Sequence, residues 1–258
     1  MKILVLVKVV PDTYKSRALS LETGLADRNA EDAVLDEIGE RALEVALAHA
    51  DAHTGTEVVV LAMAPELAQA SLRKALAMGA SAAVQVTDER LVGADVVLTA
   101  QVLAAAARHL GFDLLVAGNA STDGSGGAVP AAMAELLAVP CATSLSEVEL
   151  TEAAVTGTRV TEGAALRIEA PLPAVISITE ALPDARLPSF KGIMAAKKKP
   201  LDAMALDDLD VDPDATDAAR SIMIAVRERP PRTAGVKIVD SGDAGARLAD
   251  FLVENRLA

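Results

Sequence analysis

The chain has few of the residues on which many functional sites depend. Its 258 residues include one cysteine, no tryptophan, one tyrosine, three phenylalanines and three histidines. The single thiol, Cys141, excludes an internal disulfide. Lysine and arginine number 24 against 37 aspartates and glutamates, which gives a formal net charge of −13. This balance disfavours binding to nucleic acid or to an anionic membrane surface.

The sequence also has no apolar run long enough to span a membrane. The amino terminus, MKILVLVKVV, is apolar, but Lys8 and Pro11 interrupt it too early for a signal peptide or a membrane-spanning helix. We therefore expect a cytoplasmic protein without membrane insertion. Because 52% of the residues are hydrophobic, the chain can bury a large core.

No catalytic arrangement is recognisable. His49 and His53 stand at a spacing that could ligate a metal, but no cysteine or carboxylate pattern supports this, and we expect two solvent-facing side chains near a helix end. His109 cannot be assembled into a Ser/His/Asp arrangement. Cys141 has no base beside it in the sequence, so we predict a core thiol rather than a nucleophile.

What the sequence does contain is an alternation of strands and helices. Nearly continuous apolar runs predict strands over residues 2–10, 57–64, 82–86 and 113–118, the first of them central and buried on both faces. Apolar side chains at three- and four-residue spacings predict helices over residues 36–50, 65–79 and 94–110. Four alternations with short connections predict an α/β fold with a doubly wound, mostly parallel sheet.

The pattern changes after Cys141. Strand-like runs with alternating side chains and glycine-containing turns cover residues 144–160, 163–170 and 173–181. Such runs are typical of antiparallel strands. We therefore predict antiparallel additions to the main sheet.

The last part of the chain, residues 200–258, is predicted to be an extended arm. It begins as an acidic stretch that is poor in large apolar groups, which favours a solvated linker. It ends with a short amphipathic helix over residues 243–258. One face of this helix carries Leu248, Phe251 and Leu252. The helix is expected to dock on its own domain, residues 1–199, or on a partner.

A glycine-rich stretch, GNASTDGSGGAVPAAMAELLAVP (residues 118–140), follows the fourth predicted strand. In a doubly wound sheet the carboxyl ends of the strands form the ligand crevice, and a glycine-rich turn before a helix presents free backbone N–H groups to an anion. Gly124, Gly126 and Gly127 allow the backbone to approach closely, and the helix predicted from Ala128 supplies its positive end. We expect a phosphate site here, and the alternative is a flexible, capped turn without a ligand.

The side chains of this stretch indicate which kind of ligand it could bind. Four of them could bond a ribose or cap the helix: Ser121, Thr122, Asp123 and Ser125. The stretch matches neither GxxxxGK[ST] nor GxGxxG, so it lacks the lysine that holds a triphosphate in a P-loop. We predict nucleotide binding without cleavage.

A second unusual stretch is LPSFKGIMAAKKKP (residues 187–200). It places one of the three phenylalanines, Phe190, among proline, serine, lysine and glycine residues that predict a loop. An exposed aromatic side chain beside a lysine triplet suits insertion into the pocket of a partner protein. The alternative is a phenylalanine that folds back onto its own domain.

Four stretches carry a resemblance to a known family over nearly the full chain. They are VKVVPDT (residues 7–13), LRKALAMGA (72–80), AGNASTDGSGGAVPAAMAELL (117–137) and PSFKGIMAAKKK (188–199), and PPRTAGVK (230–237) is also similar. With these stretches the chain resembles the β subunits of electron transfer flavoproteins. The resemblance implies an adenine-nucleotide α-hydrolase-like fold, a heterodimer with an α subunit, an FAD held mainly by that α subunit, and AMP in the crevice of this chain.

The resemblance also implies which residues contact the nucleotides. Those expected at AMP are Val7, Lys8, Val9, Asp36, Ala62, Met63, Ala64, Asn119, Thr122, Asp123, Gly124, Ser125, Gly126, Gly127, Ala128 and Val129. Tyr14 and Ile38 lie near positions at which the family touches the FAD. Many members have asparagine in place of Asp36, and glutamine and threonine in place of Ala128 and Val129, which leaves only backbone donors at these two loop positions.

In this family the segment before the lysine triplet is a recognition loop that binds acyl-CoA dehydrogenases through one apolar side chain, often leucine. Phe190 occupies that place. The residues expected to contact an acyl-CoA dehydrogenase or a related flavin dehydrogenase are Pro188, Ser189, Phe190, Lys191, Gly192, Ile193, Met194, Lys197, Lys198 and Lys199. The three lysines pair with acidic groups of a partner or keep the segment soluble.

The chain is accordingly predicted to be an electron carrier and not an enzyme. Electron transfer through a bound cofactor needs no acid, base or nucleophile of the protein, which agrees with the missing catalytic arrangement. Two alternatives remain open. Within the same family, FAD could occupy the crevice and the protein could oxidise NADH and bifurcate its electrons. Outside the family, the chain could be a stand-alone sensor that binds ATP or AMP.

Overall fold

The chain is described from a computed structural model, which covers residues 1–15, 17–26, 33–215 and 220–257. It forms two compact units, Met1–Ile224 and Ala225–Ala258, and each is described by itself. The first unit contains the sheets, the helices that cover them and both predicted sites. The second unit consists of an irregular segment and one helix.

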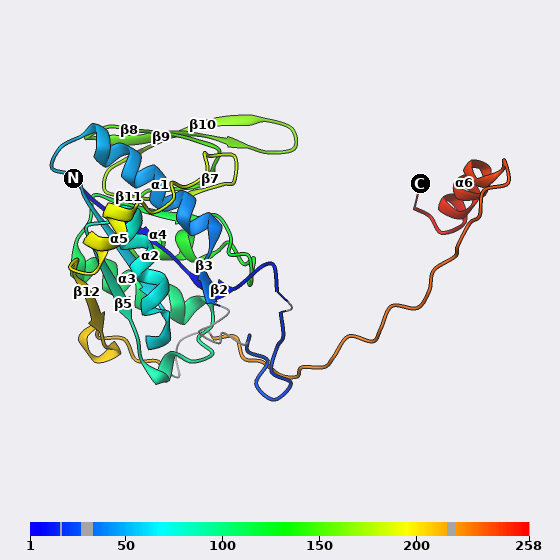
Figure 1. Ribbon diagram of the computed structural model, residues 1–258, viewed down its shortest axis with the longest axis horizontal. Coiled ribbons are helices and arrows are strands. Elements are labelled where there is room, and N and C mark those ends of the chain that lie inside the picture. Colours follow the sequence, from blue (N-terminus) through cyan, green and yellow to red (C-terminus); the bar gives the residue numbers. More distant parts are fainter. Residues whose placement is uncertain (16, 27–32, 216–219, 258) are drawn as a thin grey trace. The chain divides into compact units, whose positions relative to one another are not determined.

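A seven-stranded sheet forms the centre of the first unit (Figure 1). In spatial order its strands are β12 (Leu201–Met204), β5 (Ala82–Val86), β4 (Glu57–Met63), β1 (Lys2–Leu6), β6 (Leu114–Gly118), β11 (Ala174–Ile178) and β7 (Cys141–Leu145). All neighbouring strands of this sheet run parallel. β1 is central and almost entirely buried, as its continuous apolar sequence requires. The predicted mostly parallel α/β sheet is confirmed.

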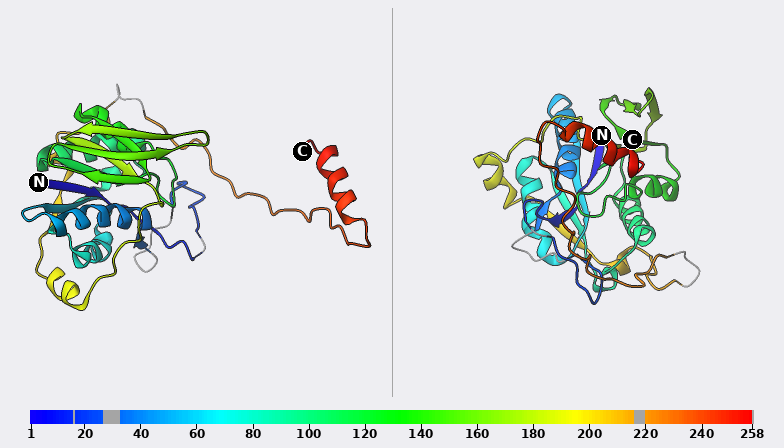
Figure 2. Two further views of the ribbon diagram at one scale, coloured as in Figure 1. Left: turned by 90° about the horizontal axis from the view of Figure 1, so that it is seen from above. Right: turned by 90° about the vertical axis from the view of Figure 1, so that its right-hand side faces the viewer.

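Helices cover both faces of the sheet (Figure 2). On one face α1 (Glu37–Ala52) and α2 (Gln69–Met78) pack against one set of buried strand side chains. On the other face α3 (Val96–Leu110) and α4 (Val129–Leu137) pack against the alternate set. Short 3₁₀ turns lie at Glu66–Ala68, Glu89–Leu91 and Leu206–Asp208. Because helices lie on both faces of the sheet, the fold is doubly wound, as predicted.

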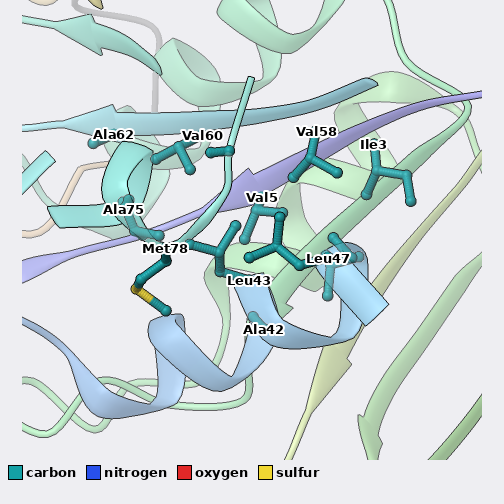
Figure 3. Close-up of a cluster of buried hydrophobic side chains, with 14 of the residues drawn as sticks. Ile3, Val5, Ala42, Leu43, Leu47, Val58, Val60, Ala62, Ala75 and Met78 are labelled. Atoms are coloured by element: carbon teal, nitrogen blue, oxygen red, sulfur yellow. The ribbon is translucent and has the colours of Figure 1, made fainter. Parts of the chain in front are cut away.

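The core side chains come from alternating positions of each strand. Val5 of β1 meets Leu43 of α1 and Met78 of α2 in one cluster (Figure 3). Leu4 and Leu61 point to the opposite face and pack with α3. Burying one such side chain stabilises the fold by about 1.5–3 kcal/mol. This packing fixes the carboxyl ends of the central strands, where the predicted nucleotide site lies.

Two small antiparallel sheets are added to this core. β8 (Glu147–Leu150), β9 (Ala154–Val160) and β10 (Ala165–Pro171) form one sheet, and β2 (Val9–Pro11) pairs with β3 (Ala33–Leu35) in the other. The antiparallel prediction is confirmed for β8, β9 and β10. It is wrong for residues 173–181, because β11 runs parallel between β6 and β7 inside the main sheet. All five residues of β11 are buried, as a strand covered on both faces requires.

The first predicted strand, residues 2–10, is divided in two. β1 ends at Leu6, and the chain leaves the main sheet before β2 begins at Val9. The Val7 N–H still donates to the Leu61 carbonyl of β4 at 3.1 Å, whereas the Lys8 carbonyl accepts from the Asp36 N–H at 2.9 Å. The break places the Lys8 side chain at the carboxyl edge of the sheet, beside the loop that follows β6.

Two segments predicted to be irregular are structured. The predicted recognition loop contains a seven-residue helix, α5 (Phe190–Ala196), which Ser189 caps by accepting a hydrogen bond from the Gly192 N–H at 3.0 Å. The acidic stretch after residue 200 begins with β12 and not with a linker, since β12 pairs with β5 and Leu206 is buried. The compact unit extends to Ile224, beyond the boundary predicted at residue 199.

The second unit contains α6 (Ala244–Glu254), within the range predicted for an amphipathic helix. Within this unit no residue of the helix is buried, and Leu248 is half exposed. Phe251 and Leu252, the other residues of the predicted apolar face, are partly exposed. Among the residues that the structure describes, no helix combines the length and the apolar character needed to cross a membrane.

Candidate functional site

The glycine-rich loop leaves the carboxyl end of β6 and leads into α4. Its start is held to β11, because the Asn119 N–H donates to the Ile178 carbonyl at 2.8 Å. The Ser125 N–H donates to the Ser121 carbonyl at 2.9 Å and closes a turn. Gly127 has a φ of 64°, in the left-handed region that glycine adopts without strain. These contacts define an ordered loop at the sheet edge where the sequence predicts a ligand.

The end of this loop presents backbone donors. In the described part of the chain, no hydrogen bond occupies the N–H groups of Gly126, Gly127, Ala128 and Val129, and the first three of these residues are exposed. A Cβ atom built on Gly126 would meet nothing within 4 Å. α4 begins directly after these donors, so its positive end adds to their attraction for an anion. The loop is therefore open to an anion and not packed shut.

The polar side chains of the loop do not cap α4. The residue before the helix is Ala128, which makes no side-chain hydrogen bond. Instead, Ser121 Oγ and Asp123 Oδ1 accept from the Gly124 N–H at 3.3 and 2.7 Å. These side chains stabilise the turn of the loop itself and not the start of α4. The donors at the start of α4 are left for another group.

Lys8 supplies a positive charge beside the loop. Its Nζ lies 2.7 Å from Asp123 Oδ1 and 3.2 Å from Ser121 Oγ. A Cβ built on Gly124 would lie 3.6 Å from this nitrogen. The Asp123 side chain is almost buried, whereas that of Lys8 is 44% exposed. A lysine ammonium has three donors, and these contacts use two of them, so the group can also bond an anion at the loop.

Asp36 places a buried carboxylate next to the same loop. Its Oδ2 accepts from the Thr122 N–H at 2.9 Å, while its Oδ1 is buried and lacks a hydrogen-bond partner in the described chain. Thr122 Oγ1 is also buried without a hydrogen bond of normal geometry. Burial raises the pKa of Asp36, although the hydrogen bonds from Thr122 act in the opposite direction. Two buried oxygens of this kind suit a ligand with hydroxyl donors, such as a ribose.

The third predicted stretch, Ala62–Ala64, lies at the end of β4 and is buried or partly buried. Gln85 holds the chain where it leaves this strand, since its Nε2 donates to the carbonyls of Ala64 and Pro65 at 3.2 and 2.6 Å. Gln85 was not predicted from the sequence. A lone glutamine in the apolar strand AAVQV was the available signal, because a buried amide needs partners.

Of the predicted nucleotide residues, the structure brings Lys8 and Asp36 to the glycine-rich loop, where they bond Asp123 and Thr122. Val7 and Val9 are buried, so their side chains face the core. Arg17, which was not predicted from the sequence either, donates to the Thr122 carbonyl. Of the two predicted FAD contacts, Tyr14 is 91% exposed, whereas Ile38 is partly buried against the core.

The second candidate site is the exposed side of α5. Phe190 is 81% exposed and does not fold back onto its own unit, so that alternative is wrong. Three other apolar side chains of the segment are also exposed: Leu187, Ile193 and Met194. Exposed apolar groups of this kind are typical of surfaces that bind another molecule.

The lysine triplet divides into two kinds of residue. Lys197 and Lys198 are exposed. Lys199 is only partly exposed, and its Nζ donates to the carbonyls of Leu76, Gly79 and Ala80 at 2.9, 3.2 and 2.6 Å. Burial lowers the pKa of Lys199. The first two lysines are therefore available to a partner, whereas the third binds the carbonyl end of α2.

The remaining candidates are the histidine pair and the single cysteine. His49 and His53 stack with their ring centroids 4.1 Å apart. The described residues contain no group of three or more His, Cys, Asp or Glu side chains that could hold a metal ion. Cys141 is exposed on the edge strand β7, so the prediction of a core thiol is wrong. Partial burial raises its pKa, which disfavours the reactive thiolate.

Comparisons with known proteins show which family the chain resembles over most of its length. The model of the family described as "Electron transfer flavoprotein domain" matches residues 23–209. The chain is 44% identical over 262 residues to the electron transfer flavoprotein subunit beta of Mycobacterium tuberculosis, covering 99% of this chain and 98% of the relative. It is 33% identical to the subunit of the same name from Bacillus subtilis, covering 95% of this chain and 93% of the relative.

A third relative carries a different name. The caffeyl-CoA reductase-Etf complex subunit CarD of Acetobacterium woodii is 32% identical over 254 residues, covering 98% of this chain and 97% of the relative. The similarity therefore extends over both units in all three relatives.

Proposed function

Because the chain belongs to the electron transfer flavoprotein family, as a relative of its β subunits, we propose that it binds AMP at the glycine-rich loop and docks flavin dehydrogenases through α5. β subunits of this family carry electrons and are not enzymes in the usual sense, and they imply an α-subunit partner. The proposal assigns the FAD mainly to that α subunit. The two parts of this proposal rest on different surfaces and are tested separately.

The observation that carries the nucleotide part is the set of backbone donors at Gly126–Val129, which make no hydrogen bond within the described chain and belong to the loop whose Asp123 pairs with Lys8. A phosphate bound there would accept from these N–H groups and from the ammonium. Asp36 Oδ1 and Thr122 Oγ1 are buried without partners in the described chain and would accept from the ribose. Because bound AMP would satisfy these groups in the folded state alone, it would stabilise the chain.

The redox chemistry would be supplied by the FAD, which takes electrons from one protein and gives them to another. Tyr14 and Ile38 are the residues of this chain proposed to contact it. Ile38 packs on Gly118, at the start of the glycine-rich loop, so a shift of the loop would also displace this side chain. The chain would thus orient the cofactor and keep water away, without donating or accepting a proton.

The docking part rests on the exposure of Phe190. A large aromatic side chain that costs little to desolvate and enters a partner pocket is a typical anchor of a protein interface. Its contact area is small, which suits a carrier that must bind and leave quickly. The exposed Lys197 and Lys198 would meet acidic groups of the partner.

The second unit is proposed to bind the α subunit. Within this unit Leu248 of α6 is half exposed, Phe251 and Leu252 are partly exposed, and no residue of the helix is buried. An amphipathic helix with an uncovered apolar face gains stability when a groove of another protein covers it. The α subunit that the family implies is the proposed partner.

The nucleotide part is tested by extracting the small molecules from the purified heterodimer and measuring their masses and amounts. The expected result is one AMP and one FAD per heterodimer. Two FAD per heterodimer without AMP would contradict the proposal. Lys8→Gln should lower AMP retention, because it removes the ammonium group that pairs with Asp123 in the glycine-rich loop.

The docking part is tested with Phe190→Ala. The variant should raise the KM for the heterodimer as electron acceptor of a purified acyl-CoA dehydrogenase by about tenfold or more, since a buried anchor contributes roughly 2 kcal/mol. Leu166→Ala is the matched control, because Leu166 is an exposed apolar residue on β10. An unchanged KM for Phe190→Ala would reject the anchor role.

A second function is favoured by one relative. The subunit from Acetobacterium woodii is named for a caffeyl-CoA reductase complex, so a chain of this family can serve a protein that acts on a CoA thioester by reduction. In that version FAD would replace AMP in the crevice and the protein would oxidise NADH and bifurcate its electrons. NADH-dependent reduction of the heterodimer, together with two FAD in the extract, would establish it.

A further inference from the structure

The helix that carries Phe190 is too short to be stable by itself. α5 has seven residues, whereas isolated helices below about 12–15 residues are marginal in water. Tertiary contacts must therefore decide whether α5 forms and where it lies. The structure shows such contacts before it, within it and after it.

Before α5, Arg186 binds the side of α1. Its Nε and one terminal nitrogen lie 2.7 and 2.8 Å from the two carboxylate oxygens of Glu44, and its backbone N–H donates to the same carboxylate at 3.0 Å. The other terminal nitrogen lies 2.8 Å from Asp51. Arg41 adds a contact from α1 to Asp184. A bidentate guanidinium–carboxylate pair fixes direction as well as distance.

After α5, Lys199 binds the end of α2. Its three contacts to the carbonyls of Leu76, Gly79 and Ala80 match the three donors of an ammonium group. A cation is also favoured at this end of a helix, where carbonyl groups lack partners. Arg73 of α2 donates to the carbonyls of Ala196 and Lys199 at 2.7 and 2.8 Å.

The side of α5 that faces α2 carries small residues, which pack closely against α2. A Cβ built on Gly192 would lie 2.2 Å from the Ala77 carbonyl oxygen, so the two backbones approach as closely as glycine alone allows. Ala196 is buried. The opposite side carries the exposed Phe190 and Met194. One side of α5 thus packs against α2 of its own chain, whereas the other side is exposed.

We propose that Arg186 and Lys199 are positioning residues, which hold α5 as a pre-formed docking surface for the partner dehydrogenase. This proposal rests on the docking function of α5 stated above. Fixing α5 before the encounter avoids the loss of conformational entropy that ordering it on binding would require. Lys199 would then affect docking without touching the partner, unlike its neighbours Lys197 and Lys198.

The test compares Lys199→Gln with Lys198→Gln in the purified heterodimer. The first variant removes three hydrogen bonds to α2, and the second removes an exposed charge of the same kind from the adjacent residue. Amide hydrogen exchange of residues 190–196 should be about tenfold faster in Lys199→Gln and unchanged in Lys198→Gln, because local opening controls exchange. Equal exchange in the two variants would overturn the proposal.

Kinetics with a purified acyl-CoA dehydrogenase add a readout that a purely structural role would not change. Lys199→Gln should raise the KM for the heterodimer by about fivefold and leave kcat within about twofold, because only the docking-competent fraction falls. A fall in kcat with an unchanged KM would overturn the positioning role. Should Lys199→Gln fail to assemble, Arg186→Lys applies the same test, since a lysine cannot reproduce the bidentate contact with Glu44.

Phe190→Ala separates this proposal from the one on which it rests. An unchanged KM in Phe190→Ala would overturn docking through α5, whatever Lys199→Gln does. A raised KM in Phe190→Ala, with exchange of residues 190–196 unchanged in Lys199→Gln, would overturn the positioning role alone.

Discussion

Gly192→Ala is the most direct test of how α5 is held. In most helices this change stabilises, because alanine exceeds glycine in helix propensity by about 1 kcal/mol. At Gly192 the added methyl group would lie 2.2 Å from the Ala77 carbonyl oxygen, which belongs to the backbone of α2 and cannot rotate away. The two effects have opposite signs, so the result shows which one prevails.

The structure indicates that the clash prevails. To restore an ordinary contact, α5 would have to move away from α2 by about 1 Å. A forced shift of this kind in a closely packed region costs about 1–3 kcal/mol, which exceeds the gain in propensity. We expect a net destabilisation of about 1–2 kcal/mol. For a chain of this size that corresponds to a fall in Tm of roughly 2–8 °C, or to local release of α5 without a global change.

Differential scanning calorimetry and hydrogen exchange of residues 190–196 distinguish these two outcomes. Gly163→Ala is the control, because a Cβ at Gly163 would meet nothing within 4 Å and should leave both measurements unchanged. The reasoning is refuted when Gly192→Ala matches or exceeds the wild-type Tm and exchanges no faster over α5.

Three further predictions concern the core and the charged groups. Since burial raises the pKa of Asp36, its contribution to stability is fully present below the unfolded pKa, near 3.8, and is lost as pH rises through the folded pKa. Asp36→Asn should therefore raise the urea midpoint of the nucleotide-free protein at pH 7 but not near pH 3.5. An equal rise at the two pH values would show that the burial of the ionised carboxylate is not the cause. Burial acts to raise the pKa of Glu44, but hydrogen bonds from Arg186 lower it overall. The contribution of Glu44 to stability is present above its unfolded pKa and is lost as pH falls through its folded pKa. The difference in Tm between wild type and Glu44→Gln should therefore be largest at neutral pH and shrink on acidification. A difference in Tm that is independent of pH would count against this ion pair. Leu43→Ala should cost about 2–5 kcal/mol in chemical denaturation, because Leu43 is fully buried between α1 and the sheet, and a loss below 1 kcal/mol would contradict the packing.

The central sheet could be predicted from the sequence because its strands are local and almost entirely apolar. β5 was predicted with its observed bounds, and the helix after the glycine-rich loop begins where Ala128 ends the turn. β11 could not be placed, because a short buried run does not reveal which strands it will lie between. Its position between β6 and β7 depends on contacts far apart in the sequence.

The site was predicted in part for the same reason. The glycine-rich loop has a local signature, so its position at the end of β6 followed from the sequence. The Lys8–Asp123 pair and the contact of Asp36 with Thr122 join residues about a hundred positions apart, and only the fold brings them together. The helical form of α5 was missed because Gly192 and a length of one to two turns weaken the local signal, while its stability comes from α1 and α2.

The position of β12 has a practical consequence for anyone who shortens this protein. A cut at residue 199 would remove Leu201–Met204 and leave the hydrogen-bonding edge of β5 uncovered along Ala83–Val86. Uncovered strand edges pair with other chains and promote aggregation. Such a fragment would also expose the surface that Leu206 and Leu209 now cover. Truncation after Ile224 keeps this edge closed, and is the better starting point for crystallisation or for separating the arm from the sheet.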